Sequence, residues 1–160
     1  MGEVFDDIAQ FAQAVGPMSP LAGLDLGTKT IGVAVTDVMQ SVSTPLETIK
    51  RTKFTTDAEV LLAICTKRAI AGLVLGLPLN MDGSDGPRVQ STRAFARNLS
   101  RLTPLPIAFW DERLSTVAAE RALLEADTSR KRRGEVIDHV AAGFILQGAL
   151  DRMRHMRQSN

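Results

Sequence analysis

One hairpin pattern near the start of the chain constrains the fold more than any other feature. The apolar runs 21–26, Leu-Ala-Gly-Leu-Asp-Leu, and 31–36, Ile-Gly-Val-Ala-Val-Thr, are separated by the turn sequence Gly-Thr-Lys-Thr. Short runs of this kind, the second rich in β-branched residues, predict two antiparallel strands joined by a tight turn. Both runs are apolar almost throughout, so we expect them to be buried in a sheet that helices cover.

The pattern after the hairpin changes from extended to alternating segments. A third extended stretch covers residues 43–49. Three strands in a row followed by alternating units predict an α/β fold, in which a mixed five-stranded sheet carries helices on both faces. Two further strands are expected at 72–76 and 107–110, helices from residue 56 and at 87–102, 116–126 and 135–153, and a basic loop at 128–134.

The residues before the hairpin form a separate pattern. Val4, Ile8, Phe11 and Val15 recur at helical spacing, and the Gly-Pro pair that follows them ends the predicted helix. A chain of 160 residues has the ordinary size of one domain. We therefore divide it into an N-terminal extension (1–18), a single domain (19–153) and a C-terminal tail (154–160).

Composition excludes several classes of protein. The net charge is +1, so no global charge argues for nucleic-acid binding. Cys65 is the only cysteine, which excludes an intramolecular disulfide and a cysteine zinc site; we interpret it as a small core hydrophobe. Residues 1–15 contain three acidic residues and no basic one, unlike a secretory signal. No apolar run approaches the roughly 20 residues that span a bilayer. We expect a cytoplasmic protein without membrane contact.

Acidic residues stand at the ends of three predicted elements. Asp25 lies in the first apolar strand, Asp111 and Glu112 follow the strand 107–110, and Asp138 lies near the start of the last helix. A buried carboxylate needs a partner or a metal ion, and Mg²⁺ prefers carboxylate oxygens and water as ligands. Two such ions about 3.5–4 Å apart can activate a water molecule and stabilise the leaving oxygen of a phosphodiester.

The residue pattern alone leaves alternatives to this site. Asp25 can accept hydrogen bonds from the amides of the following turn, and Asp138 can be stabilised by the helix dipole. Asp111 and Glu112 can pair with Arg113 at the surface. Since neighbours on a strand point to opposite faces, only one of these two acids can normally face the site.

Basic residues gather in two places. Arg93, Arg97 and Arg101 are spaced by four on a predicted helix that has Arg88 near its start, and we interpret the stripe as a solvated helix face. Residues 130–133 are consecutive basic residues shortly before Asp138, which is typical of a contact to nucleic acid. Aromatic residues make up 4% of the chain, so a platform for stacking single-stranded bases is not evident.

Four segments together resemble the YqgF/RuvX family, proposed pre-16S rRNA nucleases once described as Holliday-junction-resolvase-like. They occur in the family's order and span most of residues 21–151. The first is Gly-Leu-Asp-Leu-Gly-Thr-Lys-Thr-Ile-Gly-Val-Ala-Val-Thr-Asp at 23–37, and the second is Gly-Leu-Pro-Leu-Asn-Met-Asp-Gly-Ser at 76–84. The third is Asp-Glu-Arg-Leu-Ser-Thr at 111–116, and the fourth is Asp-His-Val-Ala-Ala at 138–142.

The resemblance implies an RNase H-like fold and cleavage of phosphodiesters with one or two Mg²⁺ or Mn²⁺ ions. It implies that Asp25, Glu112 and Asp138 bind the metal, with Asp111 as a further possible ligand. The implied substrate is structured RNA, at the 5′ end of pre-16S rRNA on ribosomal precursor particles in the bacterial cytoplasm. Expected nucleic-acid contacts are Lys29, Arg113, Arg130, Lys131, Arg132 and Arg133. Further candidate site residues are Asn80, Arg88, Arg93 and His139, and the alternatives for His139 are assistance at a metal site or in proton transfer and a purely structural role.

Other functions stay open at this stage. A resolvase of branched DNA and a non-catalytic RNA-binding module for ribosome assembly both fit the same fold, because a fold does not define a function. An ATPase of the actin type also begins with Asp-x-Gly-Thr on a hairpin, but it needs two such domains and this chain supplies one. The chain departs from the family by its N-terminal extension and by His139, where many members have a small polar residue.

Overall fold

The fold is built on one six-stranded sheet. A computed structural model describes the backbone of residues 1–114 and 130–158, and the side chains of these residues except 130–138. The strand order is β1-β6-β5-β2-β3-β4. The strands are β1 (Val4–Phe5), β2 (Leu21–Leu26), β3 (Thr30–Thr36), β4 (Ser43–Lys50), β5 (Gly72–Leu77) and β6 (Ile107–Asp111). The described α-helices are α1 (Ile8–Val15), α2 (Phe54–Lys67), α3 (Pro87–Ser100) and α5 (Arg130–Gln158). A short 3₁₀ helix, η1 (Glu112–Leu114), follows β6.

Strand directions divide the sheet into two halves. β2, β3 and β4 form an antiparallel meander, whereas β5 runs parallel to β2, and β6 runs parallel to β5. This is the mixed sheet that three consecutive strands followed by alternating units predict. Because β2, β5 and β6 are parallel, their carboxyl ends reach the same edge of the sheet, which we call the C-terminal edge.

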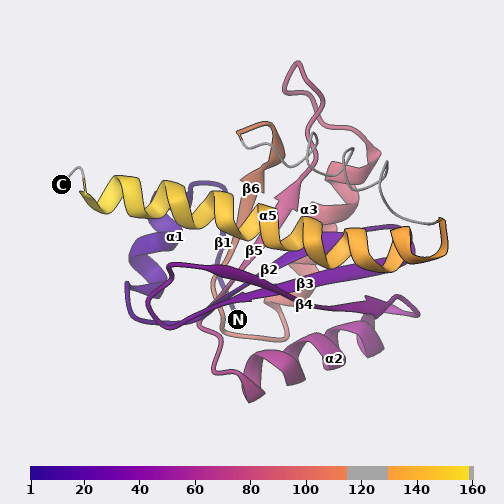
Figure 1. Ribbon diagram of the computed structural model, residues 1–160, viewed down its shortest axis with the longest axis horizontal. Coiled ribbons are helices and arrows are strands. Elements are labelled where there is room, and N and C mark those ends of the chain that lie inside the picture. The colour runs from indigo at the N-terminus through magenta and orange to yellow at the C-terminus, as the bar shows by residue number, and fades with distance from the viewer. Residues whose placement is uncertain (115–129, 159–160) are drawn as a thin grey trace.

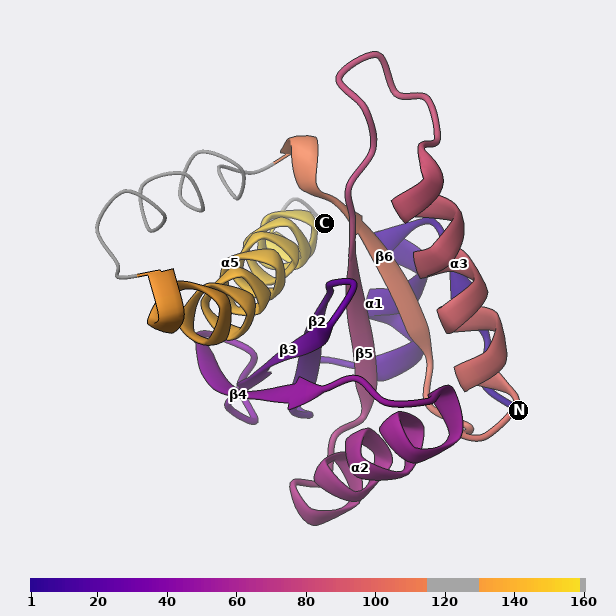
Figure 2. The same cartoon turned by 90° about the vertical axis from the view of Figure 1, so that its right-hand side faces the viewer.

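Helices cover both faces of the sheet, as the sequence predicts (Figures 1 and 2). α2 and α3 lie on one face, where Leu61 and Leu99 join the core with Leu24 of β2. α1 and α5 lie on the other face, where Leu146 packs in a second core with Leu21. Leu21 and Leu24 face opposite sides because successive strand residues alternate. None of the helices in the described part of the chain is long and apolar enough to cross a membrane.

The sheet has six strands where the sequence predicts five, because the N-terminal extension contributes β1. Val4 lies beside Ile107, and the Ile107 amide donates to the Glu3 carbonyl at 2.9 Å. β1 thereby covers the edge of β6, which would otherwise present unpaired backbone groups. The predicted helix starts at Ile8 rather than Val4, and the Asp7 carboxylate caps it by accepting from the Ala9 amide at 2.9 Å.

α1 packs closely on the sheet instead of forming an appendage. Phe11 is fully buried in the core that α1 shares with α5. A side chain at position 72 would meet Phe11 Cζ at 2.8 Å and Val15 Cγ1 at 2.6 Å, so only glycine lets the helix approach β5 this closely. Residues 1–18 therefore contribute both a strand and a helix to the packed fold.

α5 is longer than the sequence predicts at both ends. It begins at Arg130, so the four basic residues expected in a loop lie in its first turns, where arginine and lysine are good helix formers. It ends at Gln158, so most of the predicted tail continues the helix. Arg157 donates to Gln40 Oε1 and Arg154 to the Ser41 carbonyl, both at 2.9 Å. The helix predicted at 116–126 lies outside the described residues.

The turn between β3 and β4 gives a prediction about pH. Asp37 accepts hydrogen bonds from the Ser41 hydroxyl at 2.6 Å and from the Val42 amide at 2.9 Å. These bonds lower the pKa of Asp37 from 3.8 to about 2. Since the folded pKa is depressed, the stabilisation is fully present above the unfolded value near 4 and is lost as pH falls through about 2.

We expect the Asp37 carboxyl to titrate near pH 2 in a carbon-13 NMR experiment. Ser41→Ala removes the strongest hydrogen bond and should move the midpoint upward, toward 3.8. A wild-type midpoint near 3.8 would contradict the hydrogen-bonded turn.

Candidate functional site

Asp25 lies near the carboxyl end of β2 and is only 4% exposed. Its neighbours Leu24 and Leu26 point into the core beneath α2 and α3. Alternation along the strand therefore directs the Asp25 side chain to the opposite face, which α5 covers. Leu24 pairs with Leu75 of β5, so the next position along β5, Gly76, lies beside Asp25.

Gly76 is also the point that Glu112 approaches. A Cβ atom added at Gly76 would collide with Ile145 of α5 and would lie 3.2 Å from Glu112 Oε2. The Glu112 carboxylate is thus held against β5 on the α5 side, although Glu112 itself follows β6. Asp25 belongs to β2 and Glu112 directly follows β6, and β5 lies between these two strands. Both residues lie at the C-terminal edge on the same face. Both residues have further interactions within the chain.

The third predicted acid, Asp138, lies in α5, and its side chain is outside the described residues. Position 138 precedes Ala142 by four residues and Ile145 by seven, so the three positions recur on one helix face. Ile145 contacts Gly76, and the Ala142 carbonyl lies 3.2 Å from a Cβ added at Gly23. No three histidine, cysteine or acidic side chains among the described residues gather closely enough to hold a metal ion. Asp25 and Glu112 supply two carboxylates, the oxygen donors that Mg²⁺ prefers.

Asp111 is held differently from its neighbour. Its Oδ2 lies 2.8 Å from Arg113 Nη2, and its Oδ1 accepts from the Arg113 amide at 2.9 Å. Burial raises the pKa of Asp111, but the hydrogen bonds from Arg113 outweigh burial and bring the pKa below its ordinary value. Asp111 therefore pairs with Arg113, as the alternative interpretation allows, whereas Glu112 reaches Gly76.

Two arginines hold the backbone next to Asp25. Arg88, at the start of α3, donates to the Leu26 carbonyl at 3.1 Å. Arg88 is an exposed residue. Arg51, which follows β4, donates to the Gly27 carbonyl at 2.6 Å. Sequence reasoning missed Arg51, because it stands in no motif and its partner lies 24 residues away. Lys29, at the tip of the same turn, is exposed.

Three further predicted site residues have partners within the fold. Arg93 donates to Asp6 Oδ1 at 2.9 Å and lies over the Phe109 ring at 5.0 Å. Asn80 donates to the Ser84 hydroxyl at 3.0 Å. His139 Nδ1 lies 2.9 Å from Thr48 Oγ1, which joins α5 to β4. The side chains of the basic run 130–133 are outside the described residues.

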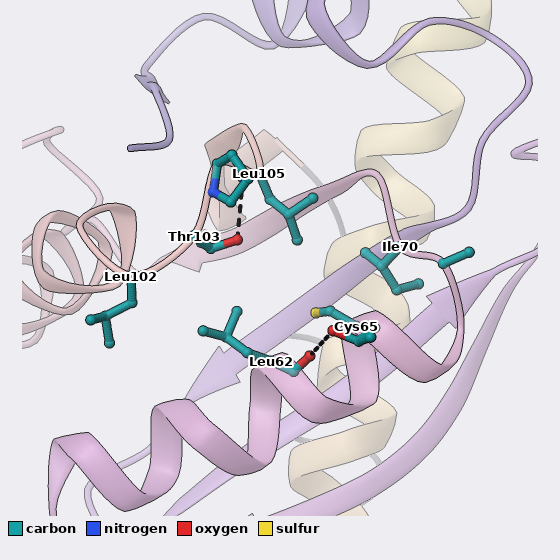
Figure 3. Close-up of a pocket in the computed structure, with 9 residues that line it drawn as sticks. Leu62, Cys65, Ile70, Leu102, Thr103 and Leu105 are labelled. Atoms are coloured by element: carbon teal, nitrogen blue, oxygen red, sulfur yellow. Dashed lines mark hydrogen bonds between the residues drawn. The ribbon is translucent and has the colours of Figure 1, made fainter.

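A cavity of about 370 Å³ lies between the end of α2 and the segment before β6 (Figure 3). Cys65 lines it, is 3% exposed, and has a pKa that burial raises to about 11, which confirms its interpretation as a core residue. The described lining residues include no charged side chain, so they do not suit a phosphate or a metal ion. The lining residues are Leu62, Cys65, Thr66, Ala69, Ile70, Leu102, Thr103, Pro104 and Leu105.

Comparison with solved structures relates this sheet to two structures of RuvC. Thermus thermophilus RuvC in complex with a Holliday junction substrate superimposes with a TM-score of 0.51 at 12% identity, covering 84% of this chain and 96% of that one. A second Thermus thermophilus RuvC structure gives a TM-score of 0.50 at 11% identity, covering 87% and 96%. At such low identity the likeness shows the fold alone, which is RNase H-like, as the sequence resemblance implies.

Sequence comparison is more specific. A protein from Ruegeria pomeroyi is 71% identical over 153 residues, which are 96% of this chain and 99% of that protein. A protein from Paracoccus denitrificans is 70% identical over 153 residues, 96% of this chain and 97% of that protein. Both are named "Putative pre-16S rRNA nuclease". Residues 19–152 match the model of the family described as RuvX, Holliday junction resolvase. The chain therefore belongs to the RuvX family.

Proposed function

We propose that this protein is a nuclease that hydrolyses phosphodiester bonds at the 5′ end of pre-16S rRNA. One observation carries the chemistry: Asp25 and Glu112 lie on the same face at the C-terminal edge, either side of a glycine. The substrate comes from relatives about 70% identical over nearly the whole chain that are named for pre-16S rRNA. Ribosomal precursor particles in the cytoplasm are then the expected place of action.

Asp25, Glu112 and Asp138 are the proposed ligands of one or two Mg²⁺ or Mn²⁺ ions. Bound there, the ions would supply an activated water and would stabilise the leaving oxygen. The residues of the chain would position these ligands. Gly76 of β5 leaves room between β2 and β6 for the carboxylates of Asp25 and Glu112. Arg51 holds the turn that follows Asp25. A rigid backbone matters because metal ligands must be fixed within fractions of an ångström.

Basic residues near these acids are the proposed contacts to the RNA backbone. Within the described part of the chain, Arg88 Nη2 donates to the Leu26 carbonyl, and the remaining N–H groups of its guanidinium are proposed to contact a phosphate. Lys29 is exposed on the neighbouring turn. The run 130–133 lies in the first turns of α5, the helix that contains Asp138. Phosphate contacts of this kind make binding depend strongly on salt.

A second candidate function is cleavage of branched DNA. The description of the matched family as a Holliday junction resolvase favours it. The same carboxylates would serve, because the chemistry at phosphorus is the same for both nucleic acids. What differs is the shape of the substrate that reaches the site.

The substrate can be decided with the full-length protein. We expect cleavage of a transcript that contains the 5′ leader and the start of 16S rRNA in Mg²⁺ or Mn²⁺, and none in EDTA. A four-way DNA junction serves as the parallel substrate under the same conditions. Cleavage of the junction with the RNA left intact would make the protein a resolvase. Metal-independent binding of the RNA with no cleavage of either substrate would make it a non-catalytic assembly module.

A further inference from the structure

We propose that Asp111 and Arg113 are positioning residues, which hold Glu112 and the loop after β5 in the geometry that metal binding needs. The proposal rests on the proposed function, in which Glu112 is a ligand and Asp111 is not. It concerns the turn where β6 ends and the loop residues 80–84, which we call the β5–α3 loop. Both rise from the same end of the sheet (Figures 1 and 2).

The turn after β6 is fixed by Asp111. Its Oδ1 accepts a hydrogen bond from the Arg113 amide at 2.9 Å, two residues further along the chain. An aspartate that binds the backbone two residues ahead mimics a backbone turn, and here it starts η1. Glu112 is the residue enclosed by this turn. The direction in which its side chain leaves the backbone toward Gly76 therefore depends on the Asp111 carboxylate.

The side chain of Arg113 ties the same carboxylate to a second segment. Its Nε and Nη2 donate to Asp111 at 3.1 and 2.8 Å, while Nη1 donates to the Met81 carbonyl at 3.4 Å. The guanidinium also lies against Gly83, which has a φ of +87°; a Cβ added there would lie 3.3 Å from Arg113 Nη1. One planar cation thus joins β6 to the β5–α3 loop.

Hydrogen bonds within the β5–α3 loop define its conformation. The backbone amide of Asn80 donates to the Ser84 carbonyl at 3.1 Å, and the Gly83 amide donates to the backbone carbonyl of Asn80 at 2.8 Å. Asp82 accepts from the Ser84 hydroxyl and adds negative charge near Arg113. The loop follows β5, the strand that carries Gly76. Arg113 therefore holds both the turn after β6, which contains Glu112, and the loop after β5, the strand that Glu112 contacts at Gly76.

The alternative role for Asp111 is direct metal binding. The two roles predict different effects on metal affinity when Arg113 is removed. If Asp111 were a ligand, Arg113 would compete with the metal for its oxygens, so removing the arginine would leave metal affinity unchanged or raise it. If Asp111 is a positioning residue, removing Arg113 lowers the affinity. Partners that orient metal ligands typically change metal affinity by about 10–100-fold when they are mutated.

The test is calorimetric titration of the full-length protein with Mn²⁺ alone, without nucleic acid. We expect Arg113→Gln and Asp111→Asn each to weaken Mn²⁺ binding by about 10–100-fold. The double variant should be less impaired than two independent losses would predict, because both changes remove the same Asp111–Arg113 ion pair. Arg113→Lys keeps the charge but cannot make the forked contact, so it should also bind weakly. Arg97→Gln, the same charge change at an exposed position of α3, is the matched control and should bind as wild type.

The outcomes separate this proposal from the proposed function. Unchanged or tighter Mn²⁺ binding by Arg113→Gln overturns the positioning role, provided that Asp25→Asn loses binding in the same assay. If Asp25→Asn binds Mn²⁺ as wild type does, the metal site itself is wrong. Thermal unfolding of each variant shows that the comparison is made between folded proteins. Arg113→Lys keeps the test decisive if the glutamine variant does not fold.

Discussion

Asp25→Asn is expected to reduce cleavage of the pre-16S transcript by at least about 100-fold in Mg²⁺ or Mn²⁺. Loss of a partner that merely orients a ligand costs up to about that factor, so loss of a ligand should cost no less. The substitution keeps the size of the side chain, and it removes a charge that is only 4% exposed. The protein should therefore stay folded while its affinity for Mn²⁺ falls.

The rate is measured by single-turnover cleavage at saturating metal, beside a thermal unfolding curve for each protein. Asp37→Asn is the matched control, because it makes the same chemical change in the exposed β3–β4 turn, at the opposite end of β2. It should cleave at the wild-type rate. A folded Asp25→Asn protein that cleaves equally fast would remove Asp25 from the proposed site.

Phe11→Ala is expected to lower the free energy of unfolding by about 3–5 kcal/mol, the usual cost of deleting a buried aromatic side chain. Phe11 is fully buried, and its ring contacts Phe5 edge-on with centroids 6.4 Å apart. It also fills the space above Gly72. The loss should be large because a helix packed on a sheet cannot easily collapse into the cavity that alanine leaves.

Urea unfolding followed by circular dichroism measures this change. Met18→Ala, at a side chain that is 59% exposed, tests removal of an apolar side chain from the same N-terminal segment. It should change the free energy of unfolding by no more than about 0.5 kcal/mol. If Phe11→Ala were equally mild, the packing of α1 against the core would contribute little to stability.

The hairpin around Asp25 shows what local sequence could predict. Apolar residues on both sides of Asp25 identify a buried strand, and the glycine at position 27 marks its turn. The three consecutive strands, the apolar strand predicted at 72–76 and the helix start at Pro87 follow from the same short-range rules. These features are predictable because backbone periodicity and turn chemistry depend on residues only a few positions apart.

The pairing of Val4 with Ile107 shows what such rules could not predict. The sequence of the extension fits a helix, yet β6 offers an open edge more than 100 residues away, and two residues become a strand there. The start of α5 at Arg130 is a similar case, since a long helix packed along β2, β3 and β4 can extend beyond its predicted start.

The surroundings of Asp25 separate what the sequence predicts from what only the tertiary structure decides. The sequence by itself determined the α/β class, the apolar strand that buries Asp25, and the set of acids from which a site could be built. Only the tertiary structure decided that Glu112 reaches Gly76 while Asp111 turns to Arg113, and that Arg51 and Arg88 hold the backbone beside Asp25. The reason is physical: neighbours on a chain share a periodicity, whereas the direction of a carboxylate depends on groups that folding brings from distant segments.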